Sequence, residues 1–349
     1  MRALPGITAV GWVGLAVAGA LLLPGAAWSG GQQPGSQAAG EALREQFAMP
    51  VAAGGSFDLS PDGRLLAAVE DDGSVSVVDT ASGNVIRTFG AQGAGGLSMV
   101  RFSPNGRLLA AALPGGVAIW DVSSGSSLRT FPVQAASLAF SPDGRWLAVG
   151  EGAGAMAIRI FDVPSGAMIR SWTAGPQGYR GVYNLAFAPD GTRLFSSQGH
   201  ERAKEWDPGT GALVRTLPGN LPYWNPDQAA AFSPDGRLLA LREGGQCEIV
   251  DLSTGSPVRR VAKGLHGEPL GFTSDGRELM VLLDSELGEG GARQHDVGLW
   301  DVGTGKAAGI IPLGTYRDFA MAKVLVSPSA NLLVRLQDNE SISVSSLVK

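Results

Sequence analysis

Residues 101–131, RFSPNGRLLAAALPGGVAIWDVSSGSSLRTF, decide the fold of this chain. Three turns, Pro-Asn-Gly, Pro-Gly-Gly and Ser-Ser-Gly, separate four short stretches. Proline presets φ for tight turns, and glycine supplies the positive φ that they need. The second and third stretches, Leu108–Leu113 and Val117–Val122, are apolar at almost every position, which is typical of strands covered on both faces. The segment therefore predicts four short antiparallel strands, the middle two of them buried.

The same unit recurs along the chain. The element Ser-Pro-Asp/Asn-Gly-Arg and its degenerate forms stand at Ser60–Arg64, Ser103–Arg107, Ser141–Arg145, Ala188–Gly191, Ser233–Arg237, Thr273–Arg277 and Ser327–Ser329. Seven copies of four strands, at a period of about 40–45 residues, are typical of a propeller. The fourth strand of most copies carries an arginine, which we expect to protect the outer edge by its charge. We therefore predict an all-β fold, a seven-bladed β-propeller of four-stranded antiparallel blades.

The two ends of the repeat region complement each other. The last copy runs through Val324–Ser327, Leu332–Leu336 and Ser341–Leu347, and has no fourth strand after it. Ahead of the first copy, Glu41–Phe47 parallels the fourth strand of the second copy, Ser126–Phe131. We expect this N-terminal strand to complete the last blade and close the ring, which removes an exposed sheet edge.

The first residues have the order of a targeting segment. A charge at Arg2 precedes the uncharged stretch Ile7–Leu23, which ends at Pro24-Gly25 and the small residues Ala26-Ala27. This order predicts a signal peptide over residues 1–29, a flexible spacer over 30–40 and the propeller over 41–349. An uncleaved anchor is the alternative, because an uncharged stretch of 17 residues stands at the short limit for a membrane span. We expect a secreted or periplasmic protein that meets a membrane only through this segment, if it stays uncleaved.

Composition excludes several kinds of site. The chain has 27 Lys and Arg against 32 Asp and Glu, a net charge of −5, which argues against broad nucleic-acid binding. Its single cysteine, Cys247, falls in a predicted third strand, where a buried and inert thiol is expected. The chain has no GxSxG, HExxH or Walker motif. We predict no cofactor, no catalytic residue and no enzymatic activity.

Trp-Asp pairs close the third strand in several copies. They stand at Trp120-Asp121, Trp206-Asp207 and Trp300-Asp301, and Phe161-Asp162, Val78-Asp79 and Val250-Asp251 take the same place elsewhere. On these pairs the chain resembles the WD40-repeat β-propeller family, and it is also similar to the secreted bacterial surface-layer propeller repeats of the YVTN type. The Gly-His pair of typical WD40 repeats is missing, so their Asp–His–Ser/Thr–Trp network is not expected in most blades. The resemblance implies a propeller fold, and one propeller fold serves many functions.

The resemblance also sorts residues by face. Loops between the fourth and first strands, and between the second and third, gather on one face in the family. Eight large polar or aromatic residues fall in the fourth-to-first loops: Tyr179, Arg180, Tyr183, Tyr223, Trp224, His266, Tyr316 and Arg317. Tyrosine, tryptophan and arginine are enriched at protein interfaces, so these residues are predicted to bind a protein partner of unknown identity.

Other functions remain open on the sequence. A propeller enzyme, such as a lactonase-like hydrolase, or a binder of a small ligand or metal would have its site at the channel mouth on the same face; a structural envelope module is a third possibility. The chain has three histidines, which is enough for a three-histidine metal site: His200, His266 and His295. We expect them instead to be solvated loop histidines. The insertion Asp284–Asp296 is expected to be a mobile loop rather than a calcium site built from Asp284, Glu286 and Glu289. The aspartates of the Ser-Pro-Asp-Gly elements are expected to form turns.

Overall fold

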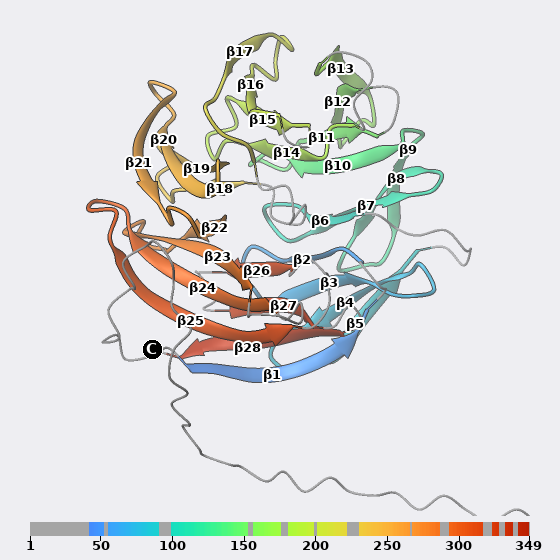
Figure 1. The fold of residues 1–349 in the computed structure, drawn as a ribbon. Helices are drawn as coiled ribbons and strands as arrows, with labels where there is room; N and C mark the ends of the chain where they lie inside the picture. The colour runs from blue at the N-terminus through green and yellow to red at the C-terminus, as the bar shows by residue number, and fades with distance from the viewer. Residues whose placement is uncertain are drawn as a thin grey trace, which may run out of the picture.

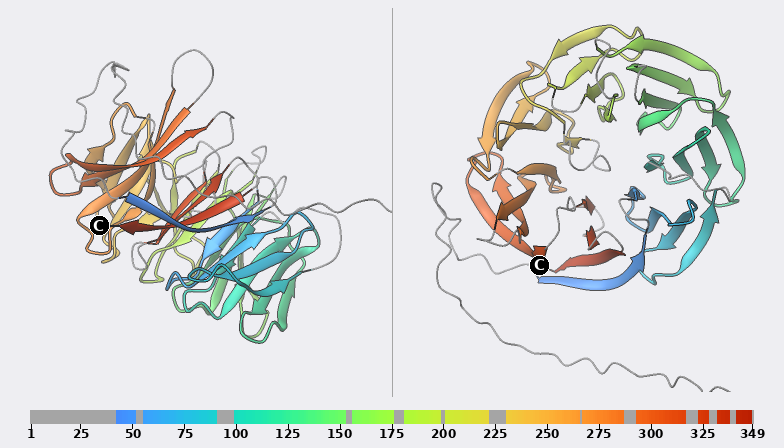
Figure 2. Two further views of the ribbon diagram at one scale, coloured as in Figure 1. Left: turned by 90° about the horizontal axis from the view of Figure 1, so that it is seen from below. Right: turned by 45° about the vertical axis from the view of Figure 1, so that its right-hand side comes forward.

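The computed structural model of the chain describes residues 42–51, 55–90, 99–152, 156–175, 181–198, 201–221, 230–265, 267–286, 293–316, 323–327, 332–337 and 341–348. These residues form seven four-stranded antiparallel sheets arranged as the blades of a ring (Figures 1 and 2). The predicted seven-bladed propeller is therefore confirmed. In the described part of the chain, no helix has the length and apolar character needed to span a membrane.

In blades one to six, each sheet follows chain order from the inner strand outward. Blades one to three are β2 (Phe57–Leu59), β3 (Leu65–Val69), β4 (Val75–Asp79) and β5 (Val85–Phe89); β6 (Met99–Phe102), β7 (Leu108–Leu113), β8 (Gly116–Asp121) and β9 (Ser127–Phe131); and β10 (Ala135–Phe140), β11 (Trp146–Glu151), β12 (Ala157–Asp162) and β13 (Met168–Thr173). Blades four to six are β14 (Asn184–Phe187), β15 (Leu194–Ser197), β16 (Lys204–Trp206) and β17 (Leu213–Thr216); β18 (Ala231–Phe232), β19 (Leu238–Glu243), β20 (Gln246–Asp251) and β21 (Ser256–Val261); and β22 (Glu268–Phe272), β23 (Glu278–Glu286), β24 (Arg293–Asp301) and β25 (Ala307–Tyr316).

Blade seven closes the ring with both ends of the chain. It joins β26 (Val324–Ser327), β27 (Leu332–Gln337) and β28 (Ser341–Val348) to the N-terminal strand β1 (Ala42–Pro50) as the outermost strand (Figure 1). The predicted closure is confirmed, but a residue-by-residue match that starts at Glu41 and Ser126 has the wrong register. That match places Arg44 where Arg129 stands, whereas the structure pairs Phe47 with Val344, as Arg129 pairs with Ile119.

The hydrophobic core lies between the blades. In β7 and β8 the four central positions of each strand are buried, as the uniformly apolar sequence predicts. One cluster joins Val69 and Phe89 of blade one to Leu109 and Trp120 of blade two, with the Phe89 and Trp120 rings 5.6 Å apart. Each blade therefore buries its faces against its neighbours, and the ring is stabilised by burial at every junction.

The outer strands share a β-bulge at one position. In β5 the register steps past Ile86, and the same step occurs at Leu128 in β9, Ile169 in β13 and Val214 in β17. A bulge places two successive side chains toward one side of the strand. It thereby turns the following arginine toward the neighbouring blade.

These arginines connect the blades. Arg87 Nη2 donates to the Ser123 carbonyl of blade two at 2.7 Å, and Arg129 donates to the Pro164 carbonyl of blade three. A Cβ on Gly125 would lie 2.8 Å from Arg87 Nη1, so the guanidinium rests directly on that glycine. Our expectation that these charges protect the free edge is corrected by this geometry: Arg87 and Arg129 hold the turn of the next blade.

The junction between blades four and five adds a buried carboxylate. Glu205 is fully buried, with Arg193 Nη1 2.9 Å from its Oε1 and Arg215 Nε 2.6 Å from its Oε2. Both arginines also donate to the Leu252 carbonyl of blade five. One carboxylate thus orients two cations toward the same turn, which fixes the position of the next blade.

Candidate functional site

The antiparallel blades divide the connections between two faces. The connections from the second to the third strand, and from the fourth strand to the next blade, lie at one end of each blade; we call this end the loop face. The connections from the first to the second strand, and from the third to the fourth, lie at the opposite end, which we call the turn face. Each face therefore collects equivalent residues from all the blades.

On the turn face, the Ser-Pro-Asp-Gly elements satisfy their own polar groups. Ser60 Oγ donates to Asp62 Oδ1 at 2.7 Å, and that carboxylate also accepts the backbone N–H of Arg64. The hydroxyl of Ser60 in turn accepts the N–H of Leu65 at 2.9 Å. The pattern repeats around the aspartates Asp143, Asp235 and Asp275. The prediction that these aspartates form turns is confirmed.

The aspartates that end the third strands cap the second set of turns. Asp121 accepts the hydroxyls of Ser123 and Ser124 and the N–H of Ser124, and these hydrogen bonds, that of Ser123 first, lower the pKa of Asp121 to about 2. The hydroxyl of Ser165, followed by the guanidinium of Arg145, lowers the pKa of Asp162 to about 2. Hydrogen bonds to a carboxylate favour its charged form, so these turns are built around an ionised aspartate.

The Trp-Asp tryptophans differ in their polar contacts. Trp206 Nε1 donates to Ser196 Oγ at 2.8 Å across β15 and β16. In the blades of Trp120 and Trp300, the strand register puts Ala111 and Val281 at the position that Ser196 occupies in blade four. Neither residue carries a hydroxyl, so the Ser–Trp contact of typical WD40 repeats is present in blade four and cannot form in the blades of Trp120 and Trp300.

The described part of the loop face carries a row of ion pairs over blades three to six. Arg159 Nε lies 2.8 Å from Glu151 Oε1, and Lys204 Nζ lies 3.4 Å from Glu201 Oε2. The next pairs cross blade junctions: Arg202 to Glu243 at 3.9 Å, and Arg242 to Glu268 at 3.6 Å. Lys204 also reaches the Ala174 carbonyl of blade three at 2.9 Å. Sequence reasoning missed this row because its residues come from different repeats and follow no motif.

The insertion in blade six forms strands. β23 and β24 extend through Asp284 and His295, which face each other in the register, and only residues 287–292 separate the two strands. His295 Nε2 lies 3.4 Å from Asp284 Oδ1, and the His295 side chain is 5% exposed. The expectation of a solvated loop histidine is wrong for His295. The expectation of a loop over Asp284–Asp296 is also wrong, because Asp284–Glu286 and Arg293–Asp296 lie in strands; the candidate calcium ligand Glu289 lies outside the described residues.

Two of the eight predicted binding residues lie in the described part of the chain. Tyr183 precedes β14, in the connection from β13, as expected, and its side chain is half-buried. Tyr316 is the last residue of β25, so its placement in a loop is wrong: the fourth strand of blade six is longer than the repeat predicts. The other six lie outside the described residues: Tyr179, Arg180, Tyr223, Trp224, His266 and Arg317.

Groups suited to chemistry are sparse in the described residues. No cluster of three or more His, Cys, Asp or Glu side chains with the geometry to hold a metal ion occurs among them. His200 and His266 lie outside the described residues. Cys247 lies in β20 and is fully buried, with its Sγ 3.5 Å from the Gly267 carbonyl, and burial raises the pKa of its thiol. The prediction of a buried thiol is therefore confirmed, and a protonated thiol is a poor nucleophile.

The chain shows local similarity to WD40-repeat proteins. A family model described as WD domain, G-beta repeat matches residues 125–162, which span β9 of blade two and β10–β12 of blade three. WD repeat-containing protein 1 of Gallus gallus is 29% identical over 125 residues, which cover 36% of this chain and 20% of that protein. An uncharacterized WD repeat-containing protein of Synechocystis sp. is 32% identical over 112 residues, 32% of this chain and 30% of its own length.

A third relative has similar coverage. WD repeat-containing protein SL1-17 of Schistosoma mansoni is 32% identical over 130 residues, 36% of this chain and 38% of that protein. The chain thus aligns with well under half the length of each of these relatives. Together with the seven-bladed fold, the matches support the resemblance to WD40-repeat propellers.

Proposed function

We propose that this chain is a non-catalytic protein-interaction platform that binds a partner protein through its loop face. The observation that carries the proposal is the contrast between the two faces. The turn face repeats one set of capped turns, whereas the described part of the loop face carries ion pairs over blades three to six that differ from blade to blade. Recognition of one specific partner requires such irregular chemistry.

The rigidity of the ring supports this role. The largely buried ion pair Arg242–Glu268 holds loop-face side chains across the junction of blades five and six. Side chains that are already ordered lose less conformational entropy when a partner binds. The tyrosine and arginine side chains predicted from the sequence would then add contact area to a preformed polar surface.

The proposal includes an extracytoplasmic location. It is supported by the N-terminal sequence Met1–Ala27, in which a positive charge, an apolar stretch and small residues follow one another as they do in a signal peptide. N-terminal sequencing of the protein isolated from its native host tests it. A mature end at Trp28 or Gly30 is expected. An intact Met1 on protein recovered from the cytoplasmic fraction would contradict the location.

A comparative cross-linking pull-down from the envelope extract of the host tests the binding face. The loop-face variant carries Tyr223→Ala, Trp224→Ala, Tyr316→Ala and Arg317→Ala, and the matched control removes three exposed turn-face arginines by Arg64→Ala, Arg107→Ala and Arg277→Ala. We expect the intact chain and the control to retain the same cross-linked partner and the loop-face variant to lose it. Equal recovery by the loop-face variant, with its unfolding temperature unchanged, would refute the proposal.

A further inference from the structure

The outer strands expose apolar side chains at equivalent positions. All eight exposed large apolar side chains of the described residues lie on the fourth strands of blades one to five: Val85, Ile86, Leu128, Met168, Ile169, Leu213, Val214 and Val258. Each of these strands is also the last in its sheet, so among the described strands its outer edge pairs with no other. An open edge with apolar side chains is a template for the addition of another strand.

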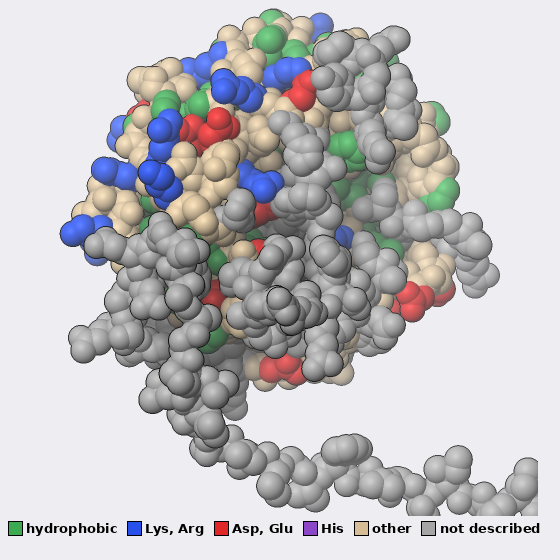
Figure 3. Space-filling model, viewed as in Figure 1, with side chains coloured by type: hydrophobic (Ala, Val, Ile, Leu, Met, Phe, Trp, Pro, Cys, Tyr) green, Lys and Arg blue, Asp and Glu red, His purple; other side chains and the backbone are tan. Residues whose placement is uncertain are grey.

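Blade five differs from the others in charge. Residues 252–265 and 302–313, which contain β21 and the start of the fourth strand of blade six, hold four Lys and Arg and no Asp or Glu. We call these four, Arg259, Arg260, Lys263 and Lys306, the basic rim. The two corresponding stretches at the junction of blades two and three, residues 122–135 and 163–174, hold two cations, Arg129 and Arg170. Figure 3 shows Lys and Arg side chains gathered over β20, β21 and the turn before β25, although the whole chain has a net charge of −5.

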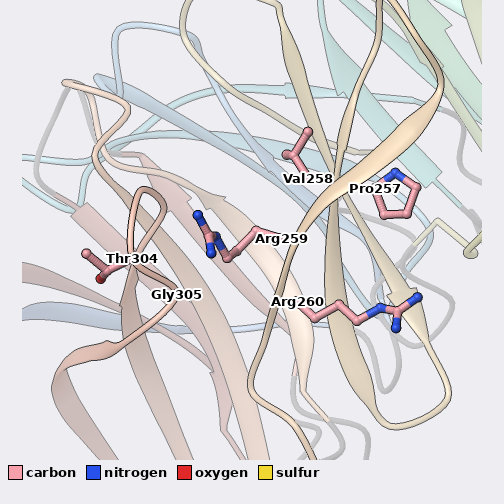
Figure 4. Close-up of a pocket in the computed structure, with 6 residues that line it drawn as sticks. All are labelled: Pro257, Val258, Arg259, Arg260, Thr304 and Gly305. Atoms are coloured by element: carbon pink, nitrogen blue, oxygen red, sulfur yellow. The ribbon is translucent and has the colours of Figure 1, made fainter.

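A groove of about 520 Å³ lies at this position. It is lined by Pro257, Val258, Arg259 and Arg260 of β21 and by Thr304 and Gly305 of the blade-six turn. The register of β21 steps past Val258, which repeats the bulge of the other outer strands. Figure 4 shows Val258 and Arg259 on the side of β21 that faces Thr304 and Gly305, and Arg260 on the other side. An apolar side chain and cations therefore flank one open strand edge.

The cations are held to different degrees. Arg259 donates to the Gly303 carbonyl and so fixes the wall of the groove, while Arg260 Nε lies 2.7 Å from the buried carboxylate of Glu248. Lys263 and Lys306 are exposed and form no ion pair with another described residue. Lys263 thus adds positive charge just beyond the end of β21, and Lys306 adds it beside the turn at Thr304–Gly305, where Asp301 offsets part of the charge of Arg259.

We propose that the groove between β21 and the turn at Thr304–Gly305 is a second interaction site, which binds an extended acidic segment of a partner protein. The segment runs along the edge of β21, where its backbone pairs with the strand, an apolar side chain contacts Val258, and its carboxylates meet the basic rim. The groove is distinct from the loop face, because its lining residues belong to β21 and to a turn-face connection of blade six. Of the basic rim, only Lys263 lies in a loop-face connection, the one that follows β21.

A polypeptide fits this site better than other anions do. The open edge of β21 offers backbone donors and acceptors, and the backbone of an extended chain satisfies both at strand spacing. Alternating side chains in such a chain would place an apolar group at Val258 and a carboxylate beside it. A planar membrane or a nucleic acid would use the charge alone and leave the strand edge unpaired.

Fluorescence anisotropy with a labelled octapeptide of alternating glutamate and valine tests this assignment on the propeller at low salt. The rim variant carries Lys263→Glu and Lys306→Glu, and the matched control carries the same change of charge on the turn face, Arg64→Glu and Arg107→Glu. A third variant, Val258→Asp, removes the apolar contact. The loop-face variant of the preceding section serves as a fourth, and anionic vesicles and single-stranded DNA are tested in parallel.

The expected result is saturable binding that the rim variant weakens by at least about tenfold, that Val258→Asp also weakens, and that added salt reduces. The turn-face control and the loop-face variant should bind as the unaltered protein does, so that failure of this site is distinguishable from failure of the loop-face proposal. No binding of the octapeptide, or equal binding by the rim variant, would overturn the assignment. Rim-dependent binding of vesicles or DNA without binding of the octapeptide would also overturn it.

Discussion

The two faces of the ring use polar residues in opposite ways. On the turn face, Asp62 and Asp121 each accept several hydrogen bonds from their own turn, so these carboxylates stabilise the turns themselves. On the loop face, Glu243 and Glu268 are engaged by arginines from elsewhere in the fold, and the pairs differ from blade to blade. The comparison teaches that the repeated motifs in this fold build its turns, whereas the surface proposed for recognition is made of residues that do not repeat.

The largest expected effect on stability is at the buried Glu205 carboxylate, which joins blades four and five through Arg193 and Arg215. Glu205→Ala would leave Arg193 and Arg215 without their carboxylate, and we expect the free energy of unfolding to fall by about 3 kcal/mol. Urea unfolding followed by tryptophan fluorescence measures the loss. The matched loop-face change, Glu243→Ala, breaks a partly exposed pair 3.9 Å long and should cost less than about 1 kcal/mol. Equal losses would contradict the distinction between the two pairs.

A second test concerns the contact of Arg87 with the next blade. Gly125 has φ of +78°, and a Cβ there would lie 2.8 Å from Arg87 Nη1, so Gly125→Ala should destabilise the ring by about 1–2 kcal/mol. Gly144→Ala is the control, because Gly144 also has a positive φ, +69°, but a Cβ there meets nothing within 4 Å. Thermal unfolding of the two variants should separate them. A Gly125→Ala variant as stable as the control would show that the arginine contact adds nothing.

The smallest expected effect is the response of the turn face to acid. The pKa of Asp121 and that of Asp162 are lowered from 3.8 to about 2, so their contribution to stability is complete above about pH 4 and is lost as the pH falls through about 2. The double variant Asp121→Ala/Asp162→Ala should therefore unfold at a lower temperature than the unaltered protein at neutral pH. That gap should narrow between pH 4 and pH 2 in calorimetry, and a constant gap would be evidence against ionised caps.

The fold could be predicted from the sequence because its signals are local and repeated. Pro, Asp and Gly at fixed spacing define the turns, and the apolar stretches between them define buried strands, so the sequence predicts the strand Leu108–Leu113 with its observed bounds. The register of β1 could not be predicted in the same way. Phe47 takes the position of an arginine because it packs on Gly83, a contact between residues of different blades that no local pattern encodes.

The candidate site was less predictable for the same physical reason. The interruption of the repeat at Asp284–Asp296 predicts a loop around His295, whereas pairing across β23, β24 and β25 extends the sheet through it. The ion pairs of the loop face and the groove beside β21 join residues from neighbouring repeats. Such contacts depend on how blades are placed beside one another, and that information appears only in the three-dimensional structure.

Hydrogen–deuterium exchange of the propeller, alone and with the partner captured by the loop-face experiment, tests the central claim most directly. The account predicts slower exchange on binding in the loop-face connections, residues 174–183 and 217–230, and unchanged exchange in the turns at 60–64 and 103–107. Protection confined to those turns, with the loop-face connections unchanged, would contradict it.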